Sequence, residues 1–487
     1  MAALAGTDRS QDVALSWPWP AWITDTAEIW WTRAAGAAAI AQVREKRTAA
    51  LIEHARTHSR FYREAWRHLH HGALRLDELP VVTKRQLMAR FDDWVTDPTI
   101  KLREVETFLD DRSNIGKRYR GRYTLWKSSG STGEPGIYIQ DPMALATYDA
   151  LLAVQANAPG IAGACAAGLL KGGRAVLIAA IGDHFASIVS WQRTCSDSPW
   201  TNMRVLSVMD PLPQRVAALN DYQPAFVASY PTVLAQLASE QSAGRLHIAP
   251  ACLWSGGECL PPAMAAAIKR AFGCTLMNEY GASECMSIAC SCRHGQLHVN
   301  ADWVVLEPVD EHYRPTPLGE PSHSVLLTNL ANFAQPLIRY DLGDSIVVDP
   351  IPCKCGSSLP VIRADGRADD VVSLSNADGE IVSLLPLALT TVVEDAANVH
   401  RFQIVQLGPD RLSLRLEAAG RQIAWHAANA ALRSYLERQS LGNVHVVLSH
   451  EAPRLEAQRQ AARSHRRAPR DLAPSCSTVS QPGPCNA

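Results

Sequence analysis

The sequence predicts an α/β protein in which a large N-terminal domain of mixed sheets and helices precedes a small α+β C-terminal domain. At 487 residues the chain is too long for one compact core, and its length suggests about two to four domains. From about residue 120 to 350, short apolar runs alternate with helical stretches, which is typical of a largely parallel sheet covered by helices. A second, shorter α/β pattern begins after Gly366.

The elements follow in order along the chain. Residues from about 26 to 70 are rich in Ala, Arg and Glu and predict one or two amphipathic helices, which the Trp cluster of residues 17–31 is expected to pack onto the body of the protein. We expect an N-terminal domain over residues 1–365, a C-terminal domain over 366–455, and a basic, disordered tail over 456–487. The clearest expected elements are strands at 174–181, 225–229, 249–255 and 275–279, and helices at 232–240, 261–272 and near 424–438.

Composition limits the classes of function. The formal net charge is −1, and 47% hydrophobic with 20% charged residues is ordinary for a soluble globular protein. This balance argues against nucleic acid or a membrane as the main partner, and no stretch reaches the ~18 apolar residues of a membrane-spanning helix. The N-terminus lacks the pattern of a signal peptide, so a cytoplasmic location is expected. The oligomeric state is open, and a homodimer is compatible with the sequence.

The most informative segment runs from Ser128 to Gly136 and reads SSGSTGEPG. Small hydroxyl residues between glycines let backbone N–H and side-chain O–H groups surround phosphate oxygens closely. The segment is not a Walker A loop, because no Gly-Lys-Ser/Thr follows at the required spacing. Taken alone, such a segment could also be a flexible linker.

Four further motifs follow in order. They are SGGE at 255–258, NEYGASE at 278–284, RYDLGD at 339–344 and GRADD at 366–370. Together with the Ser/Gly segment, they resemble the adenylate-forming superfamily of acyl-CoA synthetases, adenylation domains and luciferases. Within it, the chain is most similar to the phenylacetate–CoA ligase branch. The resemblance covers roughly residues 75–455, and it implies a small, mobile C-terminal domain and an enzyme that activates an acid as its AMP ester.

The resemblance implies a role for individual residues. Tyr280 would stack on the adenine, Asp344 would bind the ribose hydroxyls, and Glu284 would hold Mg²⁺, which spreads phosphate charge. Arg367 would contact ribose or phosphate, and Asp369 would be the hinge between the domains. Thr132, Glu284, Arg367 and Asp369 are the candidate catalytic residues. The remaining candidate ATP-binding residues are Ser128, Ser129, Gly130, Ser131, Thr132, Gly133, Gly256, Gly257, Glu258, Gly281, Ala282 and Ser283.

Five Cys and His residues are candidates for a metal site. Thiolate and imidazole are the preferred ligands of zinc, and four of them complete a tetrahedral structural site. The spacings C-x5-H and C-x-C resemble the zinc-binding elements of phenylacetate–CoA ligase relatives. The favoured set is Cys292, His298, Cys353 and Cys355, with Cys290 as a substitute. Reduced cysteines without a metal are the alternative.

The acid pocket is less clearly marked. By position, the segments Gly182–Phe185 and Ser229–Pro231 are expected to line it, with His184, Phe185 and Tyr230 as the candidate residues. His184 could orient or deprotonate a substrate, since its ordinary pKa lies near neutrality. A packed structural histidine is an equal alternative. The aromatic neighbours favour a flat aryl acid.

Two departures from the superfamily pattern keep the acceptor open. No lysine follows Lys354, although superfamily members usually carry a C-terminal lysine at the reacting carboxylate, and the corresponding stretch offers only arginines such as Arg459 and Arg463. The glycine that many CoA ligases have after the hinge is also absent. CoA is therefore one candidate co-substrate. The alternatives are an ATP-dependent diazotase that activates nitrous acid for N–N bond formation with an aromatic amine, and a degenerate nucleotide-binding protein.

Overall fold

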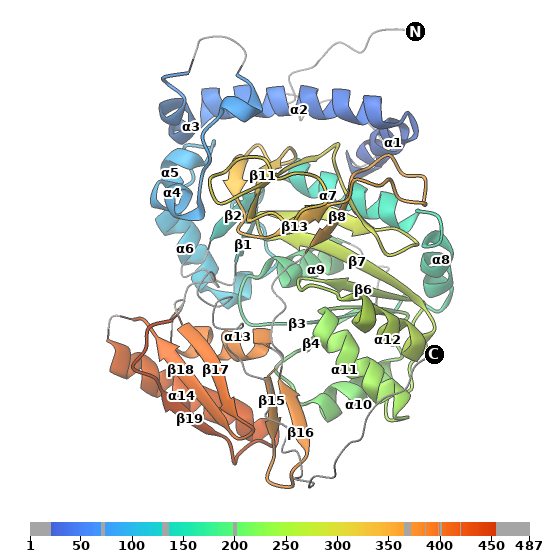
Figure 1. Ribbon diagram of the computed structural model, residues 1–487, viewed down its shortest axis with the longest axis vertical. Coiled ribbons are helices and arrows are strands. Elements are labelled where there is room, and N and C mark those ends of the chain that lie inside the picture. Colours follow the sequence, from blue (N-terminus) through green and yellow to red (C-terminus); the bar gives the residue numbers. More distant parts are fainter. Residues whose placement is uncertain are drawn as a thin grey trace, which may run out of the picture.

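The computed structural model describes residues 21–69, 74–128, 136–197, 202–364, 372–384, 386–397, 399, 402–418 and 420–453. Helices from the start of the described chain lie at one end of the molecule, a large sheet with its covering helices occupies the middle, and a smaller C-terminal sheet unit lies at the other end (Figure 1). The predicted α/β class, with a large N-terminal and a small C-terminal part, is confirmed.

The predicted N-terminal helical segment forms three helices rather than one or two. They are α1 (Ala21–Ala34), α2 (Ala37–His58) and α3 (Arg60–Ala65). The first break falls at Gly36, whose φ of 92° suits glycine. The second falls at Ser59, whose side chain accepts a hydrogen bond from the N–H of Tyr62 and so caps α3. Short helices continue the chain: α4 (Lys84–Ala89), α5 (Phe91–Trp94) and α6 (Leu102–Asp110), with 3₁₀ turns at Leu76–Glu78 and Arg112–Asn114.

The tryptophan side chains of α1 are more exposed than the sequence predicts. Trp22, Trp30 and Trp31 are 41%, 56% and 67% exposed, whereas Ile29 of the same helix is buried. The prediction that the Trp cluster packs this segment onto the body is therefore wrong for these three residues, because α1 turns its Ile29 face inward and these rings outward. Trp17 and Trp19 lie outside the described residues.

The central sheet has nine strands in the order β13-β14-β9-β8-β7-β6-β5-β3-β4. Its strands are β3 (Ala175–Ala179), β4 (Met203–Ser207), β5 (Phe226–Ser229), β6 (Cys252–Gly256), β7 (Thr275–Ala282), β8 (Cys285–Ser291), β9 (Leu297–Val299), β13 (Ile346–Val348) and β14 (Val361–Ala364). The neighbouring strands β4, β3, β5, β6 and β7 run parallel to one another. The remaining pairs, β7–β8, β8–β9, β9–β14 and β14–β13, are antiparallel. The expected largely parallel sheet therefore holds for only about half of its strands.

Helices cover both faces of the parallel half. On one face, β3 and β5 pack against α9 (Ala186–Asp197), and β6 and β7 pack against α8 (Ala162–Leu170). The helices of the other face are α10 (Leu212–Tyr222), α11 (Pro231–Ser242) and α12 (Pro262–Phe272). Helix α7 (Pro142–Ala156) packs on β8 and on α1. The crossovers leave the carboxyl ends of β3, β5, β6 and β7 at one edge, where α/β sheets bind ligands.

Two smaller sheets flank this edge. One is the pair of β1 (Thr124–Lys127) and β2 (Ile137–Gln140), between which the predicted phosphate loop falls in the sequence. The other is an antiparallel sheet of β10 (Val304–Val309), β11 (Ser324–Asn329) and β12 (Leu337–Asp341).

The C-terminal unit combines a hairpin, two helices and a three-stranded sheet. The hairpin pairs β15 (Val372–Ser375) with β16 (Ile381–Leu384), the helices are α13 (Pro386–Ala397) and α14 (Arg421–Arg438), and the sheet contains β17 (Phe402–Gly408), β18 (Arg411–Leu416) and β19 (His445–Leu448). This unit contacts the large sheet unit directly. The Gln439 side chain donates to the carbonyl oxygen of Met209 at 3.1 Å, and Arg112 lies 3.7 Å from Asp395 of α13. Among the described helices, none combines the length and the apolar character that spanning a bilayer requires.

Candidate active site

The base of the predicted phosphate loop is closed by hydrogen bonds. The N–H of Ser128 donates to the carbonyl oxygen of Gly136 at 2.9 Å, and the Ser128 hydroxyl oxygen accepts from the N–H of Gly136 at 2.7 Å. These bonds continue the β1–β2 pairing and fix where the loop leaves and rejoins the hairpin. The loop residues Ser129, Gly130, Ser131, Thr132 and Gly133 lie outside the described residues.

The carboxylate of Glu284 is a meeting point for side chains from distant segments. Tyr138 of β2 and Tyr340 of β12 donate hydroxyl hydrogen bonds to Glu284 Oε1 at 2.5 Å and 2.8 Å. The Nζ of Lys84, the first residue of α4, lies 3.8 Å from the same oxygen and 3.5 Å from the hydroxyl of Ser128. The Glu284 side chain is only 7% exposed, so solvent and salt screen these interactions weakly. The arrangement joins a carboxylate, an ammonium group and the base of the phosphate loop.

The two tyrosines define which oxygen of Glu284 remains available. Burial, and then the charge of Glu284, raise the pKa of Tyr138 and of Tyr340, so both remain protonated donors at neutral pH. In the part of the chain that the structure describes, no residue donates a hydrogen bond to Glu284 Oε2. A carboxylate held by one oxygen presents the other as a ligand for a hard cation such as Mg²⁺.

The β7–β8 turn that carries Glu284 depends on a glycine. A Cβ atom at Gly281 would lie 1.9 Å from the carbonyl oxygen of Met286, so no other residue permits β7 and β8 to approach so closely at this turn. Ala282 ends β7, Ser283 and Glu284 form the turn, and the indole N–H of Trp126 donates to the carbonyl oxygen of Ser283 at 2.7 Å. The turn is thus anchored to β1, which leads into the phosphate loop.

Two residues assigned to the nucleoside are bonded to each other. The hydroxyl of Tyr280 donates to Asp344 Oδ2 at 2.7 Å. Burial, followed by the charge of Asp344, raises the pKa of Tyr280, which keeps the hydroxyl protonated. The pair places an aromatic ring beside a carboxylate, which suits a base and its ribose.

The Gly-Gly-Glu segment closes the end of β6. Gly257 has a φ of 79°, and its Cα faces the Tyr230 ring so closely that an added Cβ would lie 3.1 Å from ring carbons. The carboxylate of Glu258 accepts from the backbone N–H and the hydroxyl of Thr232, at 3.1 Å and 2.7 Å, near the N-terminus of α11. The side chain of Glu258 therefore stabilises the start of α11. The backbone of Gly256 and Gly257 is the part of this segment that is left to form a surface for the predicted nucleotide.

The candidate acid-pocket residues lie in different environments. His184 is buried, and its Nε2 lies 3.3 Å from the carbonyl oxygen of Asp111. Burial lowers the pKa of His184, so the ring is held neutral, as in a packed structural histidine. Phe185 and Tyr230 are only partly buried, and they pack both with α9 on one face of the sheet and against the apolar cluster of the other face. Of the three candidates, these two remain accessible to a ligand.

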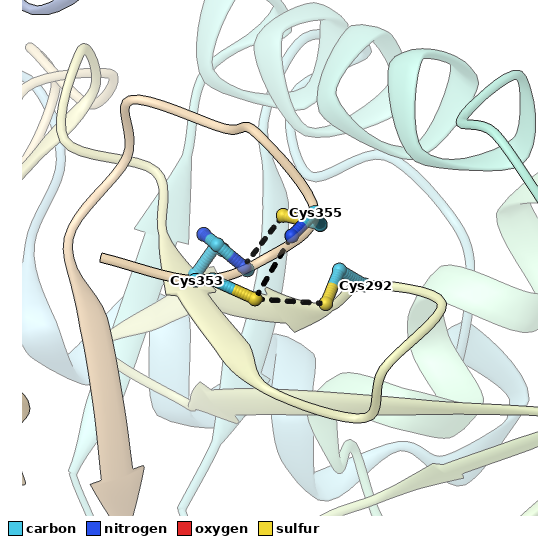
Figure 2. Close-up of side chains that lie close together, drawn as sticks. Cys292, Cys353 and Cys355 are labelled. Carbon is cyan, nitrogen blue, oxygen red and sulfur yellow. Dashed lines mark hydrogen bonds between the residues drawn. The ribbon is translucent and has the colours of Figure 1, made fainter. Parts of the chain in front are cut away.

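The predicted metal ligands come together. One ligand atom from each of Cys292, His298, Cys353 and Cys355 lies within 4.8 Å of the others. Figure 2 shows Cys292 approaching from one loop and Cys353 and Cys355 from another. The Cys292 and Cys353 sulfurs are 3.7 Å apart, and His298 Nε2 is 3.4 Å from the sulfur of Cys355. Cys290 is not part of this cluster.

Backbone groups around the cluster suit thiolate ligands. The sulfurs of Cys292, Cys353 and Cys355 each accept a backbone N–H, at 3.4 Å, 3.5 Å and 3.4 Å. His298 Nδ1 lies 3.2 Å from the carbonyl oxygen of Leu359, and a donated N–H there would leave Nε2 as the ligand atom. The donor set fits a tetrahedral zinc ion.

No protein-family model matches the sequence. Protein CapK of Staphylococcus aureus is 25% identical over 206 residues, and the match spans 41% of this chain and only 43% of that protein. The structure of 2-hydroxyisobutyryl-CoA ligase with 2-HIB-AMP and CoA in the thioesterification state is 19% identical, with a TM-score of 0.51 over 87% of this chain and 92% of that chain. A benzoate CoA ligase from Burkholderia xenovorans LB400 is 16% identical, with a TM-score of 0.37 over 69% of this chain and 68% of that chain.

The chain has the adenylate-forming fold. The resemblance to the superfamily that the ordered motifs indicated is thereby confirmed at the level of the fold. The phenylacetate–CoA ligase branch remains a prediction. Among the residues assigned to ATP, the described ones lie where β6 and β7 end and on the neighbouring strands and loops; these are Ser128, Gly256, Gly257, Glu258, Tyr280, Gly281, Ala282, Ser283, Glu284 and Asp344.

Arg367 and Asp369 lie outside the described residues of this adenylate-forming fold. Sequence reasoning missed Lys84 and Tyr138, because neither belongs to a recognised motif. Tyr340 lies within RYDLGD but received no role. The only local signal for Lys84 is its place directly after Thr83, which caps α4, and that signal does not indicate a ligand.

Proposed function

We propose that the protein uses Mg-ATP to convert a small acid into its AMP ester and then passes the acyl group to CoA or to another nucleophile. The observation that supports this most strongly is the convergence on Glu284. A buried carboxylate, the ammonium group of Lys84 and the base of the Ser/Gly loop meet within 3.8 Å. The Tyr280–Asp344 pair adds a surface suited to a nucleoside.

In this proposal the chain's residues divide the work of binding. Tyr280 offers its ring to adenine, Asp344 accepts from the ribose hydroxyls, and the Ser/Gly loop donates to the phosphates. Glu284 would ligate Mg²⁺ through Oε2, and the ion would spread the phosphate charge during attack by the acid. Arg367 and Asp369 keep the roles that the superfamily resemblance implies, and Thr132 is proposed as one of the phosphate-binding residues of the Ser/Gly loop. The division into residues 1–365, 366–455 and 456–487 is likewise part of the proposal.

Lys84 offers an answer to the missing C-terminal lysine. Its ammonium group lies 3.5 Å from the hydroxyl of Ser128, at the base of the loop. A positive charge fixed there can stabilise the charge that develops on phosphate oxygens in the transition state. We therefore assign Lys84 part of the electrostatic role that superfamily members give to the later lysine. An arginine after residue 453 remains the alternative source.

The acid and the acceptor form the less defined half of the proposal. Partly buried Phe185 and Tyr230 favour an aryl acid, and CoA is the leading acceptor because of the superfamily resemblance. ATP-dependent activation of nitrous acid remains an outcome for experiment rather than a second proposal, since no feature of the structure favours it. The convergent contacts at Glu284 make a degenerate nucleotide-binding protein the weakest interpretation.

We further propose that Cys292, His298, Cys353 and Cys355 hold a structural zinc ion. The ion would join the turn after β8 to the loop before β14 and take no part in the chemistry. The donor set and the N–H···S hydrogen bonds support this assignment.

The proposed activity is tested by pyrophosphate-dependent ATP exchange with a panel of aryl and small aliphatic acids. AMP release is then measured with CoA, and with nitrite plus aminoaryl acids. Exchange with an acid and CoA-dependent AMP release would support the ligase, whereas nitrite-dependent release alone would replace it with the diazotase.

The matched variants for this test are Glu284→Gln and Glu311→Gln. Glu284→Gln should abolish exchange while circular dichroism remains unchanged. Glu311→Gln, on the exposed turn between β10 and β11, should leave exchange intact. Absence of exchange with every acid, or full activity of Glu284→Gln, would overturn the proposal.

A further inference from the structure

Glu279 is a carboxyl group in the sheet that the proposed chemistry does not use. It lies on β7 directly before Tyr280, opposite Gly256 of β6 on one side and Cys290 of β8 on the other. This is the carboxyl end of the parallel strands, where ligands bind in such sheets. Consecutive residues of a strand are only about 3.3 Å apart along it, so Glu279 lies next to the proposed nucleoside site.

The partners of Glu279 are neutral. The indole N–H of Trp254 donates to its Oε2 at 3.0 Å, the thiol of Cys290 lies 4.0 Å from Oε1, and the Ser287 hydroxyl also bonds to it. Among the described residues, none forms an ion pair with Glu279. A carboxylate placed in such surroundings without a cation is costly, so it requires either a proton or a cationic ligand. Burial accordingly raises the pKa of Glu279 to about 7.

The face on which Glu279 lies adjoins the candidate acid pocket. Side chains alternate along a strand, so Glu279 shares a face with Met277 and points away from the Tyr280 side. Met277 pairs with Trp254, and Trp254 pairs with Ala228 of β5. Ala228 packs with Phe185 and Tyr230 under α9.

Glu279 and its neighbours also retain some solvent exposure. Glu279, Trp254 and Met286 are only partly buried, and so are Phe185 and Tyr230. The hydroxyl of Ser190 on α9 contacts the Met286 sulfur at 3.0 Å, which places α9 beside the β7–β8 turn. A ligand group that reached this side of β7 would therefore meet the Glu279 carboxyl group.

We propose that Glu279 determines specificity by binding a protonated amine carried by the acid substrate. The inference rests on the proposed function, because it assigns Glu279 to the acid half of that site. In this arrangement Tyr280 faces the nucleotide and Glu279 faces the acid. The end of β7 would therefore position both reactants. The substrate class is an acid whose basic nitrogen lies remote from the reacting carboxylate.

The test compares matched acids that differ in charge. The pairs are 3- and 4-(aminomethyl)benzoate against 3- and 4-ethylbenzoate, and 4-aminobutyrate against pentanoate. The readout is kcat/KM in ATP–pyrophosphate exchange, divided into kcat and KM. The wild type should favour the ammonium member of at least one pair by about 10- to 100-fold, as expected for a charge-assisted hydrogen bond.

The decisive variant is Glu279→Gln, which keeps an acceptor oxygen for the Trp254 N–H and removes the charge. It should raise KM for the ammonium acid by about 10-fold or more and leave the neutral acid unchanged. Glu279→Asp, which keeps the charge, should retain part of the preference. Glu307→Gln is the matched control, because Glu307 is also a partly buried carboxyl but is paired with Arg339 at 3.2 Å. It should leave the ratio of the two acids unchanged.

The outcomes separate the two levels of the proposal. If wild-type enzyme activates neutral acids as well as ammonium acids, or if Glu279→Gln keeps the preference, the inference about Glu279 is overturned and the ligase assignment stands. If no acid supports exchange, both fall. Loss of activity with both members of a pair, together with a changed circular dichroism spectrum, would identify Glu279 as structural and would also overturn the inference.

Discussion

The hydroxyl of Tyr280 donates a 2.7 Å hydrogen bond to the carboxylate of Asp344, a residue 64 positions further along the chain. The two residues belong to different sequence motifs, since Tyr280 is in β7 of the central sheet and Asp344 lies in the loop between β12 and β13. One bond therefore fixes the ring and the carboxylate relative to each other before any ligand binds. Such preorganisation lowers the entropic cost of binding.

This relationship predicts the effect of Tyr280→Phe, which keeps the ring and removes the donor. Hydrogen bonds to charged groups contribute about 1.5–3 kcal/mol, part of which Asp344 can recover from ribose or water. We expect KM for ATP to rise about 5- to 10-fold while kcat falls less. Steady-state exchange kinetics at saturating acid would measure both. An unchanged KM would show that the bond does not organise the nucleotide site.

The same pair shows what sequence could and could not predict. Tyr280, Asp344 and Glu284 were placed in one site because their motifs occur in a recognisable order. The Cys/His cluster was predicted because thiolate and imidazole are the preferred ligands of zinc and because the spacings resemble the zinc-binding elements of phenylacetate–CoA ligase relatives. The contacts of Lys84, Tyr138 and Glu279, on which their proposed roles rest, were missed, because they are tertiary contacts that no local pattern encodes.

The errors in the fold prediction have a similar origin. The alternation of apolar runs and helices predicts parallel strands, but it does not show that β7 turns back into β8 and changes the sheet to antiparallel. The exposed Trp30 and Trp31 were misplaced because their hydrophobicity favours burial, whereas the orientation of α1 decides the outcome.

Tyr138 provides a second prediction, since it and Tyr340 both hold Oε1 of Glu284. Tyr138→Phe should leave Glu284 less well oriented and raise the Mg²⁺ concentration needed for half-maximal exchange by about 5- to 10-fold. A titration of activity with Mg²⁺ at fixed ATP measures this shift. The matched control is Tyr123→Phe, because the Tyr123 hydroxyl also donates to a carboxylate, Asp97, at 2.9 Å. Both variants should lose some stability, but only Tyr138→Phe should need more Mg²⁺ for half-maximal exchange. The same increase in Tyr123→Phe would show that the effect does not come from the contact with Glu284.

Glu279 predicts a pH dependence of stability whose sign can be worked out. Its pKa rises from 4.5 to about 7 on folding, mainly because burial disfavours the carboxylate. The folded state therefore binds the proton more tightly, and this contribution is fully present below pH 4.5 and is lost as pH rises to about 7. Its upper limit is about 3 kcal/mol, and partial exposure of the side chain reduces it. The facing thiol of Cys290 does not titrate in this range, because burial raises its pKa.

The measurement is urea unfolding of wild type and Glu279→Gln at pH 5, 6 and 8. The variant should be more stable relative to wild type at pH 8 than at pH 5, because it removes a carboxylate that is costly only when ionised. Other carboxyl groups with raised pKa values, such as Asp141 and Glu307, contribute equally to both proteins and cancel in the difference. Parallel pH profiles would contradict the assigned pKa.

The Cys/His cluster gives the last prediction, which concerns metal content and stability together. If the four residues hold zinc, the purified protein should contain about one zinc ion per chain, and Cys353→Ser should lose it and unfold at a temperature about 5–10 °C lower. Cys290→Ser is the matched control, because Cys290 lies outside the cluster and contacts Glu279 and Ser287 instead. Plasma emission spectroscopy measures the zinc, and thermal unfolding followed by circular dichroism measures the stability. If the purified wild type contains no metal and unfolds at the same temperature as Cys353→Ser, the cluster consists of reduced thiols beside a histidine. Protein contacts alone would then hold the turn after β8 to the loop before β14.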